Sequence, residues 1–241
     1  MPGPTYVGPM TKRLQVEVWS DIACPWCYVG KRRFEAALAR FPHATSVDLV
    51  WRAFELDPSA PRVRDRGVSY AERLGKKYGK SPQEAQLMLD RMTEVAAADG
   101  LEFHFERAQS GNTFDAHRVL HLAHERGVQG AVKERLLRAY MTEGEPIGEP
   151  ETLARLGGEA GLDAEEVRAV LAGDTYAREV RSDEEQARAA GINGVPFFVF
   201  ARRYAVSGAQ TPEVLLEALT QAWGAVEPSV AEGATCGPDG C

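Results

Sequence analysis

The pattern of apolar and polar residues divides the chain into two strand-forming ends and a helical middle. Residues 14–19 alternate in character and are rich in β-branched side chains, so they predict a strand, and residues 46–51 predict a second one. Between the two, residues 29–38 place apolar side chains at helical spacing, and Pro42 follows them. We therefore expect a β-α-β unit with parallel strands over about residues 14–52.

Helical spacing dominates from about residue 67 to residue 190. Ser81, Pro82 and Glu84 form a capping box with proline at the first helical position, and Gly100 is the expected end of that helix. Further helices are expected at residues 113–126, 128–143, 163–173 and 175–190. This segment is therefore expected to be all-helical.

Strand patterns return after Gly191. Residues 196–200 and 204–206 are short apolar runs that predict a hairpin, and Thr211 caps a last helix through Trp223. The order of elements is β-α-β, a helical block, then β-β-α, which predicts an α/β fold. The outer segments would build one mixed sheet with flanking helices, into which an all-helical domain is inserted.

The expected domain boundaries lie where composition and periodicity change. Residues 14–62 and 191–223 are expected to form the sheet domain, and residues 63–190 the inserted helical domain. Residues 1–13 are expected to be a disordered lead. Residues 224–241 are rich in Gly, Pro and Ala with weak periodicity, which predicts a flexible tail.

Composition and charge narrow the function classes. The chain has 241 residues, of which 44% are hydrophobic and 26% charged, as in ordinary globular proteins. A net charge of −7 does not favour nucleic-acid binding, and no apolar run approaches the roughly 18 residues of a membrane span. The N-terminus lacks the features of a signal peptide, so a cytoplasmic location is expected. Structural disulfides are rare there, which makes the four cysteines candidates for redox, sensing or metal chemistry.

The first cysteine pair is the motif Cys24-Pro25-Trp26-Cys27, directly after the first strand and at the start of a helix. The positive end of the helix stabilises a thiolate at Cys24, and such positions lower a cysteine pKa from about 8.5 to roughly 3.5–7.5. Cys27 lies one turn on, where it can resolve a mixed disulfide, and Pro25 suits a first helical turn. A buried structural pair or half of a zinc site are the alternatives. The predicted chemistry needs no cofactor.

Several motifs in order carry a family resemblance. They are residues 18–30 around the cysteine pair, 52–58 after the second strand, 112–118 in the helical block, and 194–199 and 207–210 near the C-terminus. Over about residues 14–223 the chain resembles the DsbA-like thioredoxin-fold family, and within it the cytoplasmic FrnE-type branch of bacteria. The resemblance implies a thioredoxin fold with an inserted helical domain and a thiol–disulfide oxidoreductase activity.

The resemblance also implies a binding site for substrate. Pro196 is expected to be cis and to face the cysteine pair, with the Val195 backbone pairing with an extended substrate. The alternative is an ordinary trans proline at the start of a strand. Expected partners are disulfide-containing or dithiol protein substrates, together with a cellular thiol reductant such as glutathione or thioredoxin.

One departure concerns Trp26, which stands where exported relatives often carry a histidine. Trp26 cannot supply a positive charge to the Cys24 thiolate, so a strongly oxidising potential is not expected. Trp26 and Tyr28 either offer an apolar contact surface to protein substrates or pack against the helical block. His117 is expected to serve helix packing or to lie at the surface, although the resemblance allows it and Asn112 to lie near the active site.

A second pair, Cys236 and Cys241, ends the chain around a Pro-Asp-Gly turn. A linker of about 12 residues has a root-mean-square span near 20 Å, so contact with the first pair is geometrically feasible. We expect an auxiliary redox pair that exchanges electrons with Cys24 and Cys27. A pair without a role and a zinc site made of all four cysteines are the alternatives.

The leading functional hypothesis is a protein disulfide reductase or isomerase that works through a Cys24–Cys27 dithiol. A glutathione-dependent isomerase or transferase on the same fold is a second hypothesis, against which the intact cysteine pair argues. A redox or zinc sensor is a third. The sequence does not determine the direction of electron flow, because that depends on the reduction potential.

Overall fold

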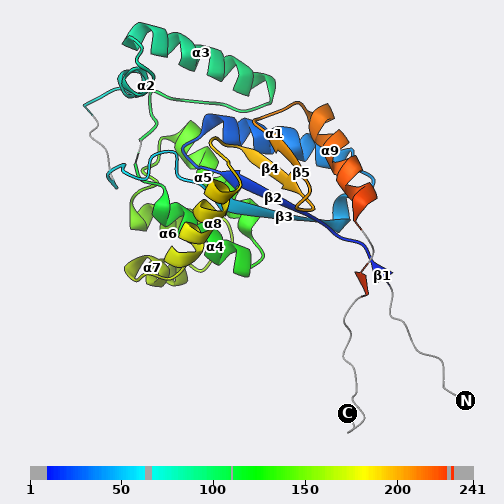
Figure 1. The fold of residues 1–241 in the computed structure, drawn as a ribbon. Coiled ribbons are helices and arrows are strands. Elements are labelled where there is room, and N and C mark those ends of the chain that lie inside the picture. The colour runs from blue at the N-terminus through cyan, green and yellow to red at the C-terminus, as the bar shows by residue number, and fades with distance from the viewer. Residues whose placement is uncertain (1–9, 63–66, 110, 227–228, 231–241) are drawn as a thin grey trace, which may run out of the picture.

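The computed structural model describes residues 10–62, 67–109, 111–226 and 229–230. Its centre is a four-stranded mixed sheet in the order β3-β2-β4-β5 (Figure 1), which confirms the predicted α/β architecture. The strands are β2 (Leu14–Ser20), β3 (Val47–Ala53), β4 (Phe197–Phe200) and β5 (Tyr204–Ser207). β2 is parallel to β3 and antiparallel to β4, so segments from both ends of the sequence meet on this central strand.

Two helices from the outer segments pack together beside the sheet. They are α1 (Pro25–Ala39) and α9 (Pro212–Ala225), which lie side by side in Figure 1. Phe34 of α1 is fully buried against Phe198 and Phe200 of β4, with ring centroids 5.7 and 6.4 Å apart. Each buried aromatic ring removes roughly 150–250 Å² from water, so this cluster is a main source of stability for the sheet domain.

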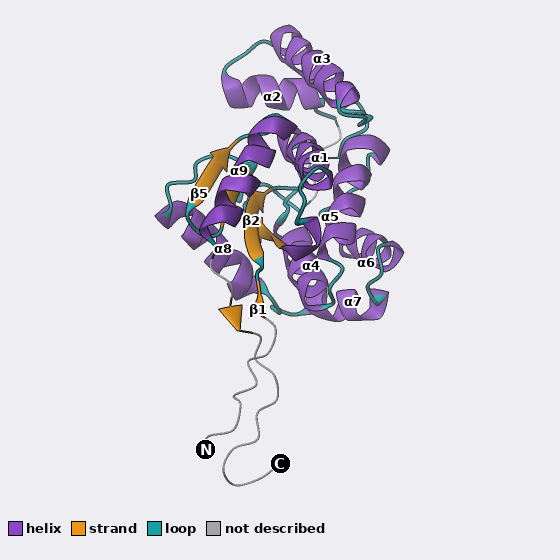
Figure 2. Ribbon diagram, turned by 90° about the vertical axis from the view of Figure 1, so that its right-hand side faces the viewer, coloured by secondary structure: helices purple, strands orange, loops and turns teal. Residues whose placement is uncertain are grey.

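The segment between β3 and β4 is helical, as predicted. Its helices are α2 (Tyr70–Tyr78), α3 (Pro82–Ala98), α4 (Phe114–Glu125), α5 (Gln129–Arg138), α6 (Pro150–Glu159), α7 (Ala164–Ala172) and α8 (Ala177–Ala189). The Ser81 hydroxyl accepts a hydrogen bond from the Glu84 N–H, and the Glu84 carboxylate accepts one from the Ser81 N–H, which confirms the capping box. α2 and α3 form a hairpin that stands apart from the sheet in both views (Figures 1 and 2).

One helix was predicted too long. The helix expected at residues 128–143 is α5 only as far as Arg138, and Ala139–Glu143 continue as a π-helical turn. The Met141 carbonyl in this turn accepts a hydrogen bond from the His104 N–H. That contact comes from a segment distant in sequence, which local periodicity does not report.

The chain ends also differ from expectation. Met10–Thr11 (β1) pairs antiparallel with Ser229–Val230 (β6), and α9 continues to Ala225. The lead expected through residue 13 and the tail expected from residue 224 therefore contain regular structure. The hydrogen bonds of this ribbon join the two ends of the chain, so neither segment reveals them by its own composition.

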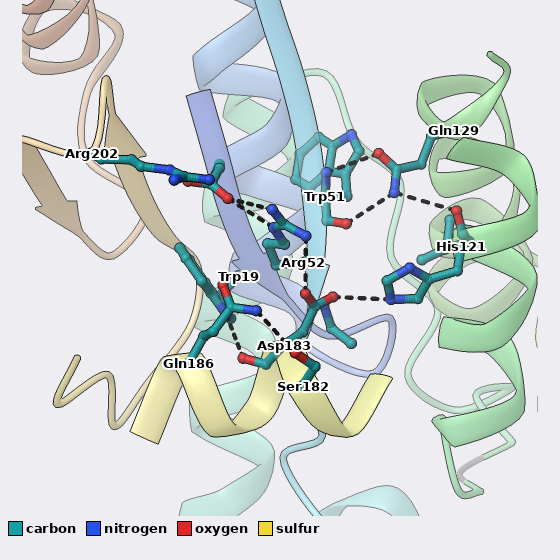
Figure 3. Close-up of polar contacts among 12 residues, drawn as sticks. Trp19, Trp51, Arg52, His121, Gln129, Ser182, Asp183, Gln186 and Arg202 are labelled. Atoms are coloured by element: carbon teal, nitrogen blue, oxygen red, sulfur yellow. Dashed lines mark hydrogen bonds and ion pairs between the residues drawn. The ribbon is translucent and has the colours of Figure 1, made fainter. Parts of the chain in front are cut away.

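The helical segment is attached to the outer edge of β3 (Figure 3). Gln129 of α5 accepts a hydrogen bond from the Trp51 N–H at 2.9 Å and donates to the Trp51 carbonyl at 2.9 Å. Asp183 of α8 accepts from the Ala53 N–H at 2.9 Å. An edge strand exposes unpaired backbone groups, and these two side chains satisfy them. The helical segment is thus bonded to the sheet through buried polar contacts.

Asp183 is the centre of this attachment. It is buried, and besides Ala53 it binds the Arg52 guanidinium at 3.2 Å and lies 3.0 Å from Nε2 of His121. Its own carbonyl accepts a hydrogen bond from the Trp19 indole at 2.9 Å. Among the described residues, no helix is long and apolar enough to cross a bilayer.

We expect Asp183→Ala to lower the free energy of unfolding by about 3 kcal/mol, because it leaves a buried N–H and two cationic or polar side chains without their carboxylate partner. Chemical denaturation measures this change. The exposed Glu185 on the same helix provides the control, and Glu185→Ala should change stability by less than about 0.5 kcal/mol. Equal effects of the two substitutions would contradict the assigned role of Asp183.

Candidate active site

Cys24 is the N-cap residue of α1, where the chain leaves β2 and enters the helix. Its backbone is extended, with φ −96° and ψ 113°, and Pro25 occupies the first helical turn as predicted. The Cys27 N–H donates to the Cys24 carbonyl at 3.0 Å, so the second cysteine lies one turn further along the helix. The structure thus confirms the strand–cysteine–helix arrangement that the sequence predicts.

The Val195–Pro196 peptide bond is cis, as the resemblance implied, and it lies against the cysteine pair. The Cys24 thiol donates to the Val195 carbonyl at 3.5 Å. Gly30 makes this approach feasible, because a Cβ added there would lie 2.7 Å from Cγ of Pro196. The alternative of an ordinary trans proline is therefore wrong for this structure.

The two sulfurs differ in accessibility. The Cys24 residue is 4% exposed and Cys27 is fully enclosed, and both are free thiols. Of the two aromatic residues with open roles, Trp26 is 44% exposed, whereas Tyr28 is buried. Tyr28 stacks on Phe103 with centroids 5.9 Å apart and donates to Glu134 at 2.7 Å. Tyr28 therefore packs against the helical segment, and Trp26 remains at the surface beside Cys24.

A buried carboxylate lies in the turn between β2 and α1. Asp21 accepts from the Leu56 N–H at 2.8 Å, and one of its oxygens lies 3.5 Å from Nε2 of His117 on α4. Burial opposes the ionisation of Asp21, but the hydrogen bond and charge of His117, with the donors Leu56 and Thr113, hold its pKa below the usual value. His117 thus reaches the turn that carries the cysteine pair.

Asn112 positions the start of α4 rather than the sulfurs. Its side-chain oxygen accepts from the Phe114 N–H at 2.8 Å, and its amide donates to Glu55 at 3.0 Å. Because Phe114 opens α4, this contact orients the helix that carries His117. The sequence anticipated both residues near the site only through the resemblance.

The acidity of the two thiols is opposite to the expectation. Burial opposes the ionisation of Cys27, but the hydrogen bond from Cys24 and the positive charge of Lys133 lower its pKa. The pKa of Cys24 is raised well above its usual range, first by the hydrogen bond to Cys27 and then by burial and the charge of Cys27. These directions run against the prediction that Cys24 holds the thiolate, first because of the hydrogen bond between the two sulfurs and then because Lys133 of α5 adds a positive charge that favours ionised Cys27.

Lys133 is the residue that sequence reasoning missed. It is fully buried on α5, and burial lowers its pKa to about 8. The signal was present, because Lys133 follows Gln129 by one helical turn and precedes Leu137 by another, on the face of α5 that packs inward. A lysine at such a position is unusual and marks a candidate functional group.

Two further expectations involve the cysteines near the C-terminus. Cys236 and Cys241 lie outside the described residues, so the predicted auxiliary pair and the four-cysteine zinc site stay predictions. Within the described ranges, no group of three or more His, Cys, Asp or Glu side chains is arranged to hold a metal ion.

Comparisons with known proteins agree with this geometry. Residues 15–220 match the model of the DSBA-like thioredoxin domain. The Bacillus subtilis (strain 168) protein YwbO is 26% identical over 209 residues, covering 86% of this chain and 96% of its own length.

Solved structures match over nearly the whole chain. The probable DsbA oxidoreductase SCO1869 from Streptomyces coelicolor is 50% identical, with a TM-score of 0.84 over 95% of this chain and 98% of its own. The cytosolic disulfide reductase DsbM from Pseudomonas aeruginosa with GSH, at 18% identity and a TM-score of 0.60 over 87% of this chain and 96% of its own, shares the fold. The chain therefore belongs to the DsbA-like thioredoxin family of thiol–disulfide oxidoreductases.

Proposed function

We propose that this protein reduces or isomerises disulfides of protein substrates through a Cys24–Cys27 dithiol in the cytoplasm, as a FrnE-type member of its family. The observation that carries the proposal is the arrangement of the sulfurs, in which Cys24, the one cysteine of the pair with any exposure (4%), faces the Val195 carbonyl, and Cys27 is fully enclosed. An attacking thiol must reach substrate, whereas a resolving thiol needs only to reach the first sulfur.

The reaction proceeds through two exchanges. The Cys24 thiolate attacks one sulfur of the substrate disulfide, which forms a mixed disulfide and releases the other substrate sulfur as a thiolate. Cys27 then attacks the Cys24 sulfur, which closes the Cys24–Cys27 disulfide and releases the remaining substrate sulfur. The substrate disulfide is reduced by two electrons and the cysteine pair is oxidised by two. A cellular thiol such as glutathione or thioredoxin returns the pair to the dithiol.

Cys24 attacks first although its pKa is raised and that of Cys27 is lowered, and a proton shared by the two sulfurs accounts for this. When Cys27 ionises, the Cys24 S–H turns from the Val195 carbonyl to the Cys27 thiolate, so the pair then holds one proton between two sulfurs. Transfer of that proton to Cys27 leaves Cys24 as the thiolate when a substrate disulfide approaches. The exposed Trp26 supplies an apolar contact for a protein substrate, and the Val195 backbone pairs with an extended segment of it.

The reduction potential of the Cys24–Cys27 pair is proposed to lie in the reducing range. Trp26 provides no charge to the Cys24 thiolate, and the cytosolic disulfide reductase DsbM shares the fold. A measured Cys24–Cys27 potential near the cytosolic glutathione poise supports a reductase or isomerase. A potential near that of strong oxidants, about −120 mV, would replace this proposal with an oxidase.

The tail pair is proposed as an auxiliary redox pair, and the β1–β6 ribbon limits how it can act. Cys236 follows Val230 by six residues and so reaches at most about 21 Å beyond β6. β2 alone spans about 23 Å, and Met10, the partner of Val230, precedes it. Cys24 lies beyond the far end of β2, so exchange through Cys236 requires β6 to separate from β1 or a second molecule to take part.

Reduction of insulin by the protein in the presence of dithiothreitol tests the catalytic roles. We expect Cys24→Ser to reduce turnover to the uncatalysed rate, because the remaining thiol of the pair, Cys27, is fully enclosed and cannot reach a substrate disulfide. Cys27→Ser should instead accumulate a mixed disulfide with substrate, visible on non-reducing gels, because the resolving thiol is absent. An active Cys24→Ser protein would contradict the assignment, and glutathione conjugation without insulin reduction would favour the transferase hypothesis.

Single-thiol variants test the shared proton. We expect Cys27→Ala to lower the pKa of Cys24, because the largest influence that raises it is contact with Cys27. Cys24→Ala should raise the pKa of Cys27, which loses its hydrogen-bond donor. Thiolate absorbance followed against pH measures both values. Shifts in the reverse directions would show that the sulfurs do not share a proton in this way.

The double variant Cys236→Ser, Cys241→Ser tests the auxiliary pair. We expect a lower rate of insulin reduction at unchanged folding, because one route for electrons into Cys24–Cys27 is removed. Turnover assays at several protein concentrations separate exchange within one molecule from exchange between two. An unchanged rate together with an unchanged potential of the first pair would remove the tail cysteines from the mechanism.

A further inference from the structure

The Lys133 side chain occupies an unusual place. It is fully buried, and among the described residues its Nζ has no hydrogen-bond partner. Its nearest described aromatic contact is the Trp51 ring of β3, whose centroid lies 5.5 Å from Nζ. An isolated buried ammonium is costly unless other charges or an aromatic face stabilise it. Packing alone does not explain a buried lysine whose amine has no hydrogen-bond partner among the described residues, which indicates a chemical role for Lys133.

The anchoring of α5 explains how Lys133 comes to the cysteine pair. Gln129 fastens α5 to the edge of β3 at Trp51 (Figure 3), and Lys133 lies one helical turn further on. Trp51 is opposite Val18 in the register with β2, and Ala53 is opposite Ser20, the last residue before the turn that carries the cysteines. The next residue of α5, Glu134, accepts a hydrogen bond from the Tyr28 hydroxyl of α1 at 2.7 Å, so the geometry places this part of α5 against the helix that carries the cysteines.

Charges from several elements surround the amine. Cys27 and Cys24 of α1 and Asp21 of the preceding turn favour its protonated form, whereas Lys31 of α1 opposes it. His117 of α4 is paired with Asp21, and Glu134 beside Lys133 on α5 is bound to Lys31. Asp21 thus has His117 as a partner of its own. Of the groups that act on Lys133, the two cysteines are the ones whose charge changes during disulfide exchange.

We propose that Lys133 is the electrostatic partner and proton store of the Cys27 sulfur, so that it sets the potential of the cysteine pair and the rate at which Cys27 resolves the mixed disulfide. This role rests on the proposed function, because resolution occurs only in disulfide exchange. In the resting dithiol the Lys133 ammonium stabilises the thiolate of the pair. Its own burial keeps the pKa close to about 8, within reach of physiological pH.

The proton balance follows from the charge states. In the mixed disulfide neither Cys24 nor Cys27 is charged, so Lys133 loses its thiolate partners, gives its proton through solvent to the substrate thiolate that the first exchange released, and becomes a neutral amine. The amine accepts the Cys27 proton, and the resulting thiolate attacks the Cys24 sulfur. The Cys24–Cys27 bond forms, the bond from Cys24 to substrate breaks, and the substrate sulfur leaves with the electron pair. Lys133 then releases its proton to solvent or to the leaving thiolate, because the disulfide carries no charge to hold it.

The variant Lys133→Met tests the proposal, since methionine fills a similar volume without charge. We expect the pKa of Cys27 to rise and the equilibrium with glutathione to shift about tenfold toward the Cys24–Cys27 disulfide, which corresponds to about 30 mV. Mixed disulfide should accumulate during insulin reduction. Thermal stability should be unchanged or higher, because an unpaired buried ammonium is replaced by an apolar group.

Arg138→Met is the matched control. It removes a positive charge from the same helix at a side chain that is 64% exposed and pairs with Glu143. We expect it to leave the thiol pKa and the equilibrium with glutathione unchanged, because an exposed charge is screened by solvent. Wild-type values of both quantities in Lys133→Met, or equal shifts in the two variants, would overturn the proposal.

A measurement on the unmodified protein keeps the test independent of folding in the variants. Carbon-detected NMR of the lysine side chains follows the titration of Lys133 in the reduced and in the oxidised protein. We expect a lower Lys133 pKa in the oxidised form, and identical values in the two forms would contradict the proposal. If the wild-type protein failed to reduce insulin, the proposed function would fall, while the titrations would still decide whether Lys133 responds to the redox state.

Discussion

The antiparallel register of β2 and β4 is the constraint on which the site depends. Trp19 lies opposite Phe197, so the end of β2 and the start of β4 are level with each other. The turn to α1 continues one strand, and the cis Val195–Pro196 bond precedes the other. Residues 171 positions apart thereby approach to 3.5 Å between the Cys24 sulfur and the Val195 carbonyl. A slip of one residue would turn the alternating side chains of β4 to the opposite face and separate these groups.

The helical segment packs against the cysteine turn and also contributes charged side chains near it, His117 and Lys133. Its attachment to β3 satisfies the backbone groups of Trp51 and Ala53 through Gln129 and Asp183, which is a buried polar contact rather than a purely apolar one. Such contacts require a defined geometry, because an unpaired buried group costs about 1–3 kcal/mol. The same geometry brings Lys133 of α5 and His117 of α4 near the cysteine turn. The inserted segment therefore lies against the turn that carries the cysteine pair.

The buried charges give the two sulfurs different properties within one short motif. A helix N-terminus favours a thiolate at either cysteine, but Lys133 lies on the side of Cys27 and the surface lies on the side of Cys24. Accessibility and acidity are thus divided between the two residues. This division suits an exchange reaction in which one sulfur meets the substrate and the other must be held in reserve.

The sequence by itself determined the features that depend on local periodicity and on short-range chemistry. The β2 and β3 strands, the α1 helix that begins at the cysteine pair, the Ser81 capping box and the hairpin after Pro196 are all visible in the order and spacing of residue types. The family resemblance added the cis bond at Pro196, which no local pattern distinguishes from a trans bond.

Only the tertiary structure decided the features that join distant segments. The positive charge that lowers the pKa of Cys27, in addition to the hydrogen bond from Cys24, comes from Lys133, more than 100 positions away. The attachment of α8 depends on Asp183 meeting the edge of β3. The β1–β6 ribbon likewise joins the two ends of the chain. Local patterns report which face of a helix or strand is buried, but the partner of a buried charge is set by the packing of elements that the chain brings together only when it folds.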